Sequence, residues 1–280
     1  MKFLLFGSSG CFGTAFEAAC ASRNVDFTGL SHQDIDILNH GDVEALISKQ
    51  KPDVIINSVA MVGINPCEED PGKAFALHAT AALNMIKESA AINATFIQTS
   101  SHAVFDGSKD EPYTEDDTPR AGNVYAVSKY AAEMFASTWC PKHYVVRFPT
   151  MYGPRRNASP GFVDKVLQWI DEGRELQIAH DKIDSPTYVK DAAEAVLELA
   201  LNKHPYGTYH IANEGIVSYY DFIKQLAALL GASNKVHPVK DADFPSLAPK
   251  ALKTSMRSIK LEPLRLWNHA LEDYVENELK

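Results

Sequence analysis

The sequence predicts an α/β protein with a doubly wound parallel sheet in its first half and a smaller, irregular domain towards the C-terminus. Three observations predict it. Over residues 2–148, short apolar runs alternate with segments in which apolar residues recur at helical spacing. A glycine-rich turn joins the first apolar run to the first helical segment. After residue 148, frequent turn signals break this alternation.

The elements of the first half follow from this alternation. The run Asp53–Ser58 follows Pro52 and is rich in β-branched residues, which is typical of a strand buried on both faces of a sheet. In chain order we expect a strand at Lys2–Phe6, a helix at Phe12–Arg23, a strand at Asp26–Leu30, a helix at Asp42–Lys49, the Asp53–Ser58 strand, a helix at about Pro71–Ile92, a strand at Ala94–Ser100, a helix at Asn123–Trp139 and a strand at His143–Phe148.

The second half is expected to be less regular. Trp267, Leu271 and Val275 lie on one face of an amphipathic helix that closes the chain. The expected elements are helices at Phe162–Glu172, Val189–Leu201, Tyr219–Leu230 and Trp267–Glu278, with a strand at Thr208–Ile211.

Composition and charge exclude several classes of protein. The 280 residues include 27 basic and 36 acidic side chains, which gives a net charge of −9, and 45% of them are hydrophobic. These proportions are ordinary for a folded protein, and the chain lacks the clustered Lys and Arg that nucleic-acid binding needs. No apolar stretch approaches the roughly 20 residues of a membrane-spanning helix. Neither nucleic acid nor a membrane is expected as a partner.

The cysteines and the N-terminus indicate a cytoplasmic protein. Cys11, Cys20, Cys67 and Cys140 show no CxxC pair and no framework spacing, so we expect reduced thiols. Met1–Gly7 begins basic and apolar like a signal peptide, but its apolar run is only about five residues, against the roughly 7–15 that a signal peptide needs. We interpret it as a buried first strand.

The glycine-rich turn reads Gly7-Ser8-Ser9-Gly10-Cys11-Phe12-Gly13. In this position Gly7 allows the tight turn, Gly10 lets backbone N–H groups approach a pyrophosphate, and Gly13 lets helix and strand pack closely. Three glycines can also form a plain tight turn, but between a strand and a helix they indicate a Rossmann-type site. We assign residues 1–148 and part of 183–213 to a dinucleotide-binding domain, and residues 149–182 and 214–280 to a substrate-binding domain.

The end of the second strand bears on the choice of cofactor. Dinucleotide sites usually have an acidic residue there, which binds the ribose 2′-hydroxyl. Here the strand ends Gly29-Leu30-Ser31-His32, so no carboxylate would repel a 2′-phosphate. Asp34 and Asp36 follow slightly later, and either bind the ribose, cap a helix or contact the adenine side. We expect NADPH as the cofactor, with NADH as the alternative.

A second motif is Tyr125-Ala126-Val127-Ser128-Lys129. Residues four apart share one face of a helix, so the phenol and the ammonium project together. The ammonium favours the phenolate of a tyrosine whose ordinary pKa is near 10. Thr99-Ser100-Ser101 stands at the end of the fourth strand, and we expect a hydroxyl there to hydrogen-bond the same substrate oxygen. A Tyr and a Lys four apart also occur by chance, but together with the glycine turn they indicate a catalytic trio.

These residues resemble the extended short-chain dehydrogenase/reductases, and nearly the whole chain is similar to the dTDP-4-dehydrorhamnose reductase family. Beyond the GxxGxxG and YxxxK motifs, the similar segments are Asp34–Ile37, Asn57–Ala60, Ser100–Gly107, Tyr113–Asp117, Asp184–Tyr188 with Asp191, and Trp267 with Leu271.

The chain departs from the pattern of this family at several positions. Ser101 stands where Thr is usual, His102 and Ala103 replace an Asp-Tyr pair, and His78 replaces a common Asn. Ala248-Pro249-Lys250 stands where an Arg-Pro segment is expected. The Thr-Asp-Glu trio of the related 4,6-dehydratases is absent, so dehydration is not expected. These departures leave the hydride chemistry in place and put the identity of the sugar in question.

The resemblance implies a reaction and its residues. It implies NAD(P)H-dependent reduction of the 4-keto group of a nucleoside-diphosphate 4-keto-6-deoxysugar, first of all dTDP-4-dehydro-L-rhamnose to dTDP-L-rhamnose, in surface polysaccharide biosynthesis. Tyr125 would donate a proton, Lys129 would hold the nicotinamide ribose, and Ser101 would orient the carbonyl. The implied cofactor-binding residues are Gly7, Ser9, Gly10, Cys11, Phe12, Gly13, Ser31, Asp36, Ile37, Ser58, Val59, Ala60, Tyr125, Lys129, Phe148, Thr150 and Met151. The implied substrate-binding residues are Ser101, His102, Val104, Tyr125 and Tyr152.

Several residues keep two interpretations. His102 either touches the substrate or is a hydrogen-bonded structural histidine. Arg155-Arg156 either binds a diphosphate or forms a solvated turn. Glu115-Asp116-Asp117 is better explained as a solvated loop than as a cation site, and Cys11 as a small filler than as a redox sensor. No metal is expected, because hydride transfer needs none.

Two other functions fit the same motifs. One is an NDP-sugar 4-epimerase that keeps NAD tightly bound. The other is a non-catalytic, NADP-binding regulatory subunit, against which the intact Ser101, Tyr125 and Lys129 argue. A homodimer is expected by analogy alone.

Overall fold

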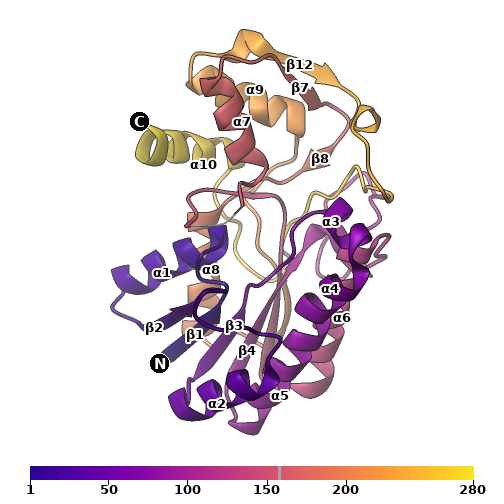
Figure 1. Cartoon of the computed structure of the whole chain (residues 1–280). Helices are drawn as coiled ribbons and strands as arrows, with labels where there is room; N and C mark the ends of the chain where they lie inside the picture. Colours follow the sequence, from indigo (N-terminus) through magenta and orange to yellow (C-terminus); the bar gives the residue numbers. More distant parts are fainter. Residues whose placement is uncertain (157–158) are drawn as a thin grey trace.

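A six-stranded parallel sheet dominates the computed structural model, which describes residues 1–156 and 159–280 (Figure 1). The strand order is β10-β5-β4-β3-β1-β2. β2 lies on one side of β1, and β3 and the later strands lie on the other, so the order in which strands are added reverses between β1 and β3. Ligands bind at such a switch point, outside the carboxyl ends of the strands. The strands are β1 (Lys2–Phe6), β2 (Asp26–Leu30), β3 (Val54–Asn57), β4 (Thr95–Ser101), β5 (His143–Phe148) and β10 (Gly207–His210).

Helices bury both faces of this sheet. Phe3 and Leu5 of β1 pack in one hydrophobic cluster, and Leu4 and Phe6 pack in a second cluster on the opposite face. The first cluster includes residues of α1 (Cys11–Ser22) and α8 (Val189–Leu201); the second includes residues of α2 (His40–Gln50), α5 (Ala81–Ala91) and α6 (Val124–Trp139). Burial on both faces explains the continuous apolar runs of the strands and confirms the predicted doubly wound fold.

The long helix expected at about Pro71–Ile92 contains an irregular turn. It is built from α4 (Pro71–Phe75), a π-helical turn η1 (Ala76–Thr80) and α5. A further helix, α3 (Ile64–Glu69), precedes it and was not expected. The Glu68 carboxylate accepts a hydrogen bond of 2.8 Å from the backbone N–H of Val124, the first residue of α6. This contact fixes α3 against the start of the helix that carries Tyr125 and Lys129.

The remaining elements form a smaller assembly beyond the carboxyl edge of the main sheet (Figure 1). It consists of short two-stranded sheets and four helices, of which α7, α9 and α10 lie where helices were expected. The helices are α7 (Phe162–Asp171), α9 (Tyr219–Leu229), α10 (Trp267–Tyr274) and the π-helical η5 (Val275–Leu279). The paired strands are β6 (Met151–Tyr152) with β9 (Thr187–Tyr188), β8 (Ile183–Asp184) with β11 (Val217–Ser218), and β7 (Leu176–Ala179) with β12 (Val236–Val239). Three 3-10 turns complete the described elements: η2 (His102–Val104), η3 (Ser233–Lys235) and η4 (Asp241–Asp243).

Tyr152 lies in the core of this smaller assembly and not at its surface. Its side chain is 0% exposed, and its ring packs against those of Tyr188, Phe222 and Tyr274 with centroids 5.3–5.7 Å apart. Aromatic neighbours thus cover the whole Tyr152 side chain, and only its backbone is available for the expected contact with the substrate. Among the described residues, no helix combines the length and the apolar character needed to cross a bilayer.

Candidate active site

The glycine turn between β1 and α1 has a geometry that fits a dinucleotide. Gly7 has a φ of +97°, and its N–H donates to the carbonyl of Leu30 at the end of β2 (2.8 Å). A Cβ on Gly13 would lie 2.4 Å from the Gly7 carbonyl oxygen, so no larger residue fits there. Gly10 caps α1 without any side-chain hydrogen bond. The N–H groups of the first turn of α1 therefore stay available to a pyrophosphate.

Other predicted cofactor residues surround this turn. Ser58, directly after β3, donates a hydrogen bond of 2.9 Å from its hydroxyl to the carbonyl of Phe6. The carbonyl of Ser9 accepts a hydrogen bond of 3.0 Å from the backbone N–H of Arg156. The turn, the end of β3 and the loop after β6 thus meet at the switch point of the sheet. Val59 and Ala60 follow β3, Thr150 joins β5 to β6, and Met151 begins β6; all four are partly exposed.

Three of the predicted cofactor residues have buried apolar side chains. The rings of Phe12 and Phe148 pack at a tilt of 37° with centroids 5.2 Å apart, and Ile37 packs in the cluster between the sheet and α2. Only the backbone of these residues is available to a ligand. Cys11, in the turn itself, points its Sγ at the carbonyl of Gly153 (3.6 Å), and burial raises the pKa of its thiol to about 12. Such a thiol stays protonated, which agrees with its interpretation as a filler.

The Asp34 carboxylate lies at the end of β2, where one of the alternatives above places a ribose ligand. The Asp34 side chain turns back and accepts hydrogen bonds from the N–H and the hydroxyl of Ser31 (2.7 and 2.6 Å). These hydrogen bonds lower the pKa of Asp34. Asp36 accepts a hydrogen bond from the N–H of Leu38 (3.0 Å) and so caps the following turn.

The structure brings Ser101, Tyr125 and Lys129 together. Ser101 is the last residue of β4, and Tyr125 and Lys129 lie one turn apart near the start of α6. Burial raises the pKa of Tyr125, and the nearby Ser101 side chain acts in the opposite direction. In this state Tyr125 is a protonated phenol. It can therefore donate a proton to an oxygen that Ser101 also contacts.

Lys129 is a buried ammonium without a protein acceptor. Its residue is 2% exposed, and no described residue forms a hydrogen bond or ion pair with its Nζ. Burial lowers the pKa of Lys129 to about 8, and the charge of Glu133 one helical turn away opposes that shift. A buried charge normally has a partner. The ribose hydroxyls of a dinucleotide would supply one, so Lys129 fits its predicted role.

We expect kcat/KM for the nicotinamide cofactor to fall as the pH rises through about 8. The pKa of Lys129 is about 8, so its charge is present below that pH and is lost above it. The raised pKa of Tyr125 keeps the phenol protonated over the same range. Steady-state kinetics from neutral to alkaline pH measures the fall. In Lys129→Arg the guanidinium does not titrate, and the fall near pH 8 should disappear. If kcat/KM still fell near pH 8 in Lys129→Arg, a group other than Lys129 would be responsible for the fall.

His78 supports Tyr125 from within the π-helical turn η1. Its Nε2 accepts a hydrogen bond from the N–H of Met61 (2.8 Å), so the proton lies on Nδ1, which contacts the Ser128 hydroxyl (2.8 Å). Ser128 in turn donates to the carbonyl of Tyr125 (3.0 Å). Burial lowers the pKa of His78 to about 3, so the ring stays neutral. The ring also meets that of Tyr125 edge-on, with centroids 5.6 Å apart.

A buried ion pair holds β4, β5 and α6 together behind the catalytic trio. The guanidinium of Arg147 on β5 donates to both carboxylate oxygens of Glu133 on α6, at 2.6–3.2 Å. The hydroxyl of Ser100, the neighbour of Ser101, donates to the same carboxylate. Glu133 is one turn after Lys129, so this contact fixes the relative position of the serine and the lysine.

His102 follows Ser101 and pairs with Asp184 of β8. The His102 Nδ1 lies 2.9 Å from Asp184 Oδ1 and 3.3 Å from the Thr254 hydroxyl. The other carboxylate oxygen of Asp184 accepts a hydrogen bond of 3.0 Å from the N–H of Thr150. His102 is thus a hydrogen-bonded histidine, and its position beside Ser101 also keeps it next to the candidate site.

Val104, also expected to bind substrate, has a buried side chain, so only its backbone is available for that contact. Its side chain is 0% exposed and packs with Phe105, Tyr113 and Met256 in a separate small core. Val104 ends the 3-10 turn η2, which begins at His102 directly after Ser101, and is the one buried residue of that turn.

Arg155 and Arg156, which follow β6, and the acidic segment Glu115–Asp117, which follows β4, form contacts within the protein. Arg155 pairs with Asp164 and Arg156 with Glu17, each at 2.7 Å. The Glu115 carboxylate accepts hydrogen bonds from the N–H groups of His210 and Ile259 (2.9 Å each). These partners favour structural roles over diphosphate or cation binding.

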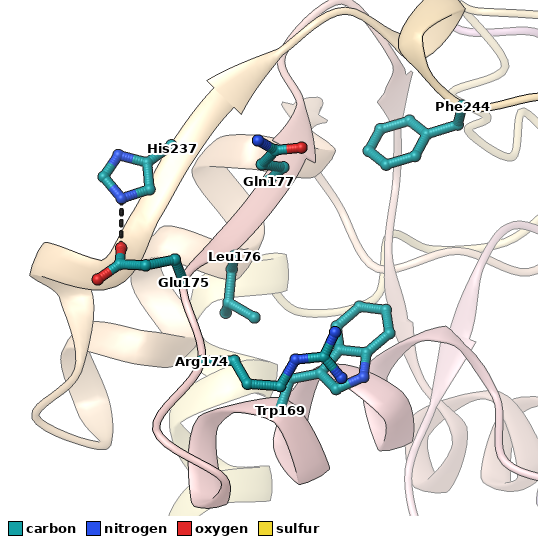
Figure 2. A pocket seen from close by; sticks show the side chains of 7 residues that line it. All are labelled: Trp169, Arg174, Glu175, Leu176, Gln177, His237 and Phe244. Carbon is teal, nitrogen blue, oxygen red and sulfur yellow. Dashed lines mark hydrogen bonds and ion pairs between the residues drawn. The ribbon is translucent and has the colours of Figure 1, made fainter.

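A separate hollow lies between α7, β7 and β12, away from these residues (Figure 2). It has a volume of about 530 Å³ and includes Trp169, Arg174 and Phe244 in its lining. His237 and Glu175 at its rim pair with each other at 2.5 Å, and Arg174 stacks on Trp169. None of the predicted site residues lines it.

Comparison with known proteins agrees with this site. The chain is 27% identical over 279 residues to the "Spore coat polysaccharide biosynthesis protein SpsK" of Bacillus subtilis, covering 98% of this chain and 97% of that protein. A crystal structure of a dTDP-4-dehydrorhamnose reductase from Clostridium acetobutylicum matches 100% of both chains with a TM-score of 0.94 and 30% identity. The dTDP-4-dehydrorhamnose reductase of Bacillus anthracis, solved in complex with NADP, matches 99% of both chains with a TM-score of 0.92 and 26% identity.

A family model gives the assignment over the whole length. The model of the RmlD substrate binding domain matches residues 1–279. The Rossmann-type sheet and the full-length similarity to a reductase at 30% identity agree with this match. The chain belongs to the RmlD substrate-binding domain family of NAD(P)-dependent nucleotide-sugar reductases.

Proposed function

We propose that this protein reduces the 4-keto group of dTDP-4-dehydro-L-rhamnose to give dTDP-L-rhamnose. We propose NADPH as its cofactor because the similar Bacillus anthracis enzyme was solved with NADP, and NADH as the alternative because the Asp34 carboxylate lies at the end of β2. The observation that carries the proposal is the meeting of Ser101, Tyr125 and Lys129 at the carboxyl edge of the sheet, next to the uncapped start of α1. The names of the similar proteins support a dTDP-sugar and a role in surface polysaccharide synthesis.

Each catalytic residue has a role that its surroundings support. The reduced nicotinamide, when bound, supplies the hydride. Tyr125 donates its phenolic proton to the oxygen of the C4 carbonyl, because burial keeps that phenol protonated. Ser101 orients the same oxygen through its hydroxyl. Lys129 holds the nicotinamide ribose and stabilises the tyrosinate that remains after proton transfer. The N–H groups at the start of α1 hold the pyrophosphate.

A panel of sugars tests the proposal. The protein is mixed with dTDP-, UDP-, GDP- and CDP-linked 4-keto-6-deoxysugars, each with NADPH and with NADH, and loss of reduced-cofactor absorbance is followed. We expect the highest kcat/KM with dTDP-4-dehydro-L-rhamnose and NADPH. A higher value with another nucleotide would reassign the substrate. No oxidation with any sugar would favour the regulatory-subunit alternative.

The 4-epimerase alternative makes a different prediction in the same assay. An epimerase keeps NAD through its cycle and turns over without added cofactor, whereas a reductase must exchange its cofactor at every turnover. Conversion of an NDP-hexose by the purified protein with no cofactor added would support the epimerase.

We expect Asp34→Asn to shift cofactor preference towards NADPH. The Asp34 carboxylate binds Ser31, which is predicted to contact the ribose end of the cofactor, so its charge opposes a 2′-phosphate. Removing that charge should raise the ratio of kcat/KM for NADPH to that for NADH by roughly two- to tenfold. The asparagine keeps an acceptor for Ser31, so the turn should persist. An unchanged ratio would place the 2′-position away from Asp34.

A further inference from the structure

The inference concerns His102 and Asp184, which the proposed reduction does not use. Asp184 is 0% exposed, and its oxygens accept hydrogen bonds from the N–H groups of Ser185 and Thr150 (2.9 and 3.0 Å) as well as facing His102. Burial alone would raise the pKa of Asp184, but its contacts with His102, Thr150 and Ser185 bring that pKa below its ordinary value. Asp184 is therefore an ionised acceptor.

An ionised acceptor fixes the state of the imidazole that faces it. Asp184 Oδ1 can only accept, so the Nδ1 of His102, 2.9 Å away, carries a proton. Within the described residues, the other ring nitrogen, Nε2, has no hydrogen-bond partner, and the His102 side chain is 15% exposed. A carboxylate that holds one imidazole nitrogen and leaves the other to a ligand is the arrangement by which proteins make histidine a general base.

The position of this pair places it beside the ketone that the trio would hold. His102 is bonded directly to Ser101, whose hydroxyl interacts with Tyr125. Through Asp184, the pair also contacts the backbone of Thr150, in the loop predicted to line the cofactor. In the proposed reduction the ketone oxygen accepts from two donors, Ser101 and Tyr125, and a base on the residue next to Ser101 would lie beside that ketone. That combination stabilises an enolate as well as an alkoxide.

We propose that the His102–Asp184 pair is a second proton-transfer unit, which exchanges and can invert the hydrogen on a carbon next to the ketone of the bound sugar. His102 Nε2 takes the proton from that carbon, and the C–H electron pair forms the C=C bond of an enolate whose oxygen is held by Ser101 and Tyr125. Return of a proton from Nε2 to the same carbon restores the ketone. No electrons are gained or lost, so no cofactor is consumed. The proposal rests on the proposed function, because it requires a 4-keto sugar in the site.

Solvent exchange tests it without any hydride transfer. The full-length protein is incubated in D2O with NADP⁺ and dTDP-4-dehydro-L-rhamnose, and deuterium at the carbons beside the ketone is followed by NMR and mass spectrometry. We expect exchange well above the rate in buffer, and a loss of about 10²–10⁴-fold in His102→Gln, whose amide keeps the contact with Asp184 but cannot carry the proton. Asp184→Asn should also lower the rate of deuterium exchange, because it removes the carboxylate that holds His102 Nδ1.

The controls separate this proposal from the reduction. Far-UV circular dichroism and NADP⁺ affinity report whether each variant is folded. NADPH oxidation by the wild-type protein with no exchange above buffer would overturn the inference and leave the reductase standing. Equal exchange in wild type and a folded His102→Gln would also overturn it, since another base would be responsible. Loss of both NADPH oxidation and exchange in the wild type would overturn the proposed function itself.

Discussion

Tyr125→Phe should lower kcat for ketone reduction by about 10²–10⁴-fold, the usual contribution of a positioned proton donor. The substitution removes one hydroxyl from a half-buried side chain and breaks its interaction with Ser101. The ring remains and keeps its edge-on contact with His78. The structure near the cofactor should therefore persist, and the dissociation constant of NADPH should be nearly unchanged. Steady-state NADPH oxidation and a fluorescence titration measure the two quantities.

Tyr130→Phe is a matched control for that substitution. Tyr130 is on the same helix, five residues after Tyr125, and packs at the edge of the small core around Val104. Removing its hydroxyl should leave kcat unchanged if the effect at position 125 comes from proton donation and not from a change in α6. Full activity in Tyr125→Phe would remove the proposed acid, whereas equal losses in both variants would indicate a structural cause.

The sequence was sufficient for features that depend on local pattern. The glycine turn, the strand that follows Pro52 and the i, i+4 spacing of Tyr125 and Lys129 each carry their structural consequence in neighbouring residues. The six-stranded sheet and its helices follow from the same periodicity. The short strands of the C-terminal part, such as β8 and β11, could not be predicted, because two residues show no periodicity.

The direction of individual side chains was also beyond the sequence. Val104 and Tyr152 each follow a residue of the predicted site closely, but tertiary packing turns both into a core. His102 and Asp184 are 82 residues apart, so their pairing depends on how β8 meets the end of β4. Asp34 was placed beyond β2 by counting along the chain, and only the turn at Ser31 reveals where its carboxylate lies. The π-helical turn that places His78 against Ser128 has no pattern of its own.

Arg147→Met should cost about 3–5 kcal/mol of unfolding free energy, because it leaves the Glu133 carboxylate buried with little compensation. In the native protein that carboxylate accepts three hydrogen bonds from the guanidinium and one from Ser100. The variant keeps only the serine. Urea denaturation of wild type and variant gives the difference. A loss of about 0–1 kcal/mol, the value for an exposed ion pair, would contradict the interpretation.

Arg147→Met should also shift the pH at which kcat/KM falls, which a loss of stability alone would not do. The charge of Glu133 acts to raise the pKa of Lys129, and Arg147 partly neutralises that charge. Without Arg147, the alkaline fall in kcat/KM should therefore move to a higher pH.

The double variant Glu133→Leu/Arg147→Met removes both charges. It should recover much of the lost stability, because a buried ion pair can often be replaced by apolar residues at little cost. Without Glu133, only burial shifts the pKa of Lys129, and it lowers that pKa. In the double variant kcat/KM should therefore fall at a lower pH than in the wild type. Opposite shifts in the two variants would establish that this ion pair sets the charge of the catalytic lysine as well as holding its helix.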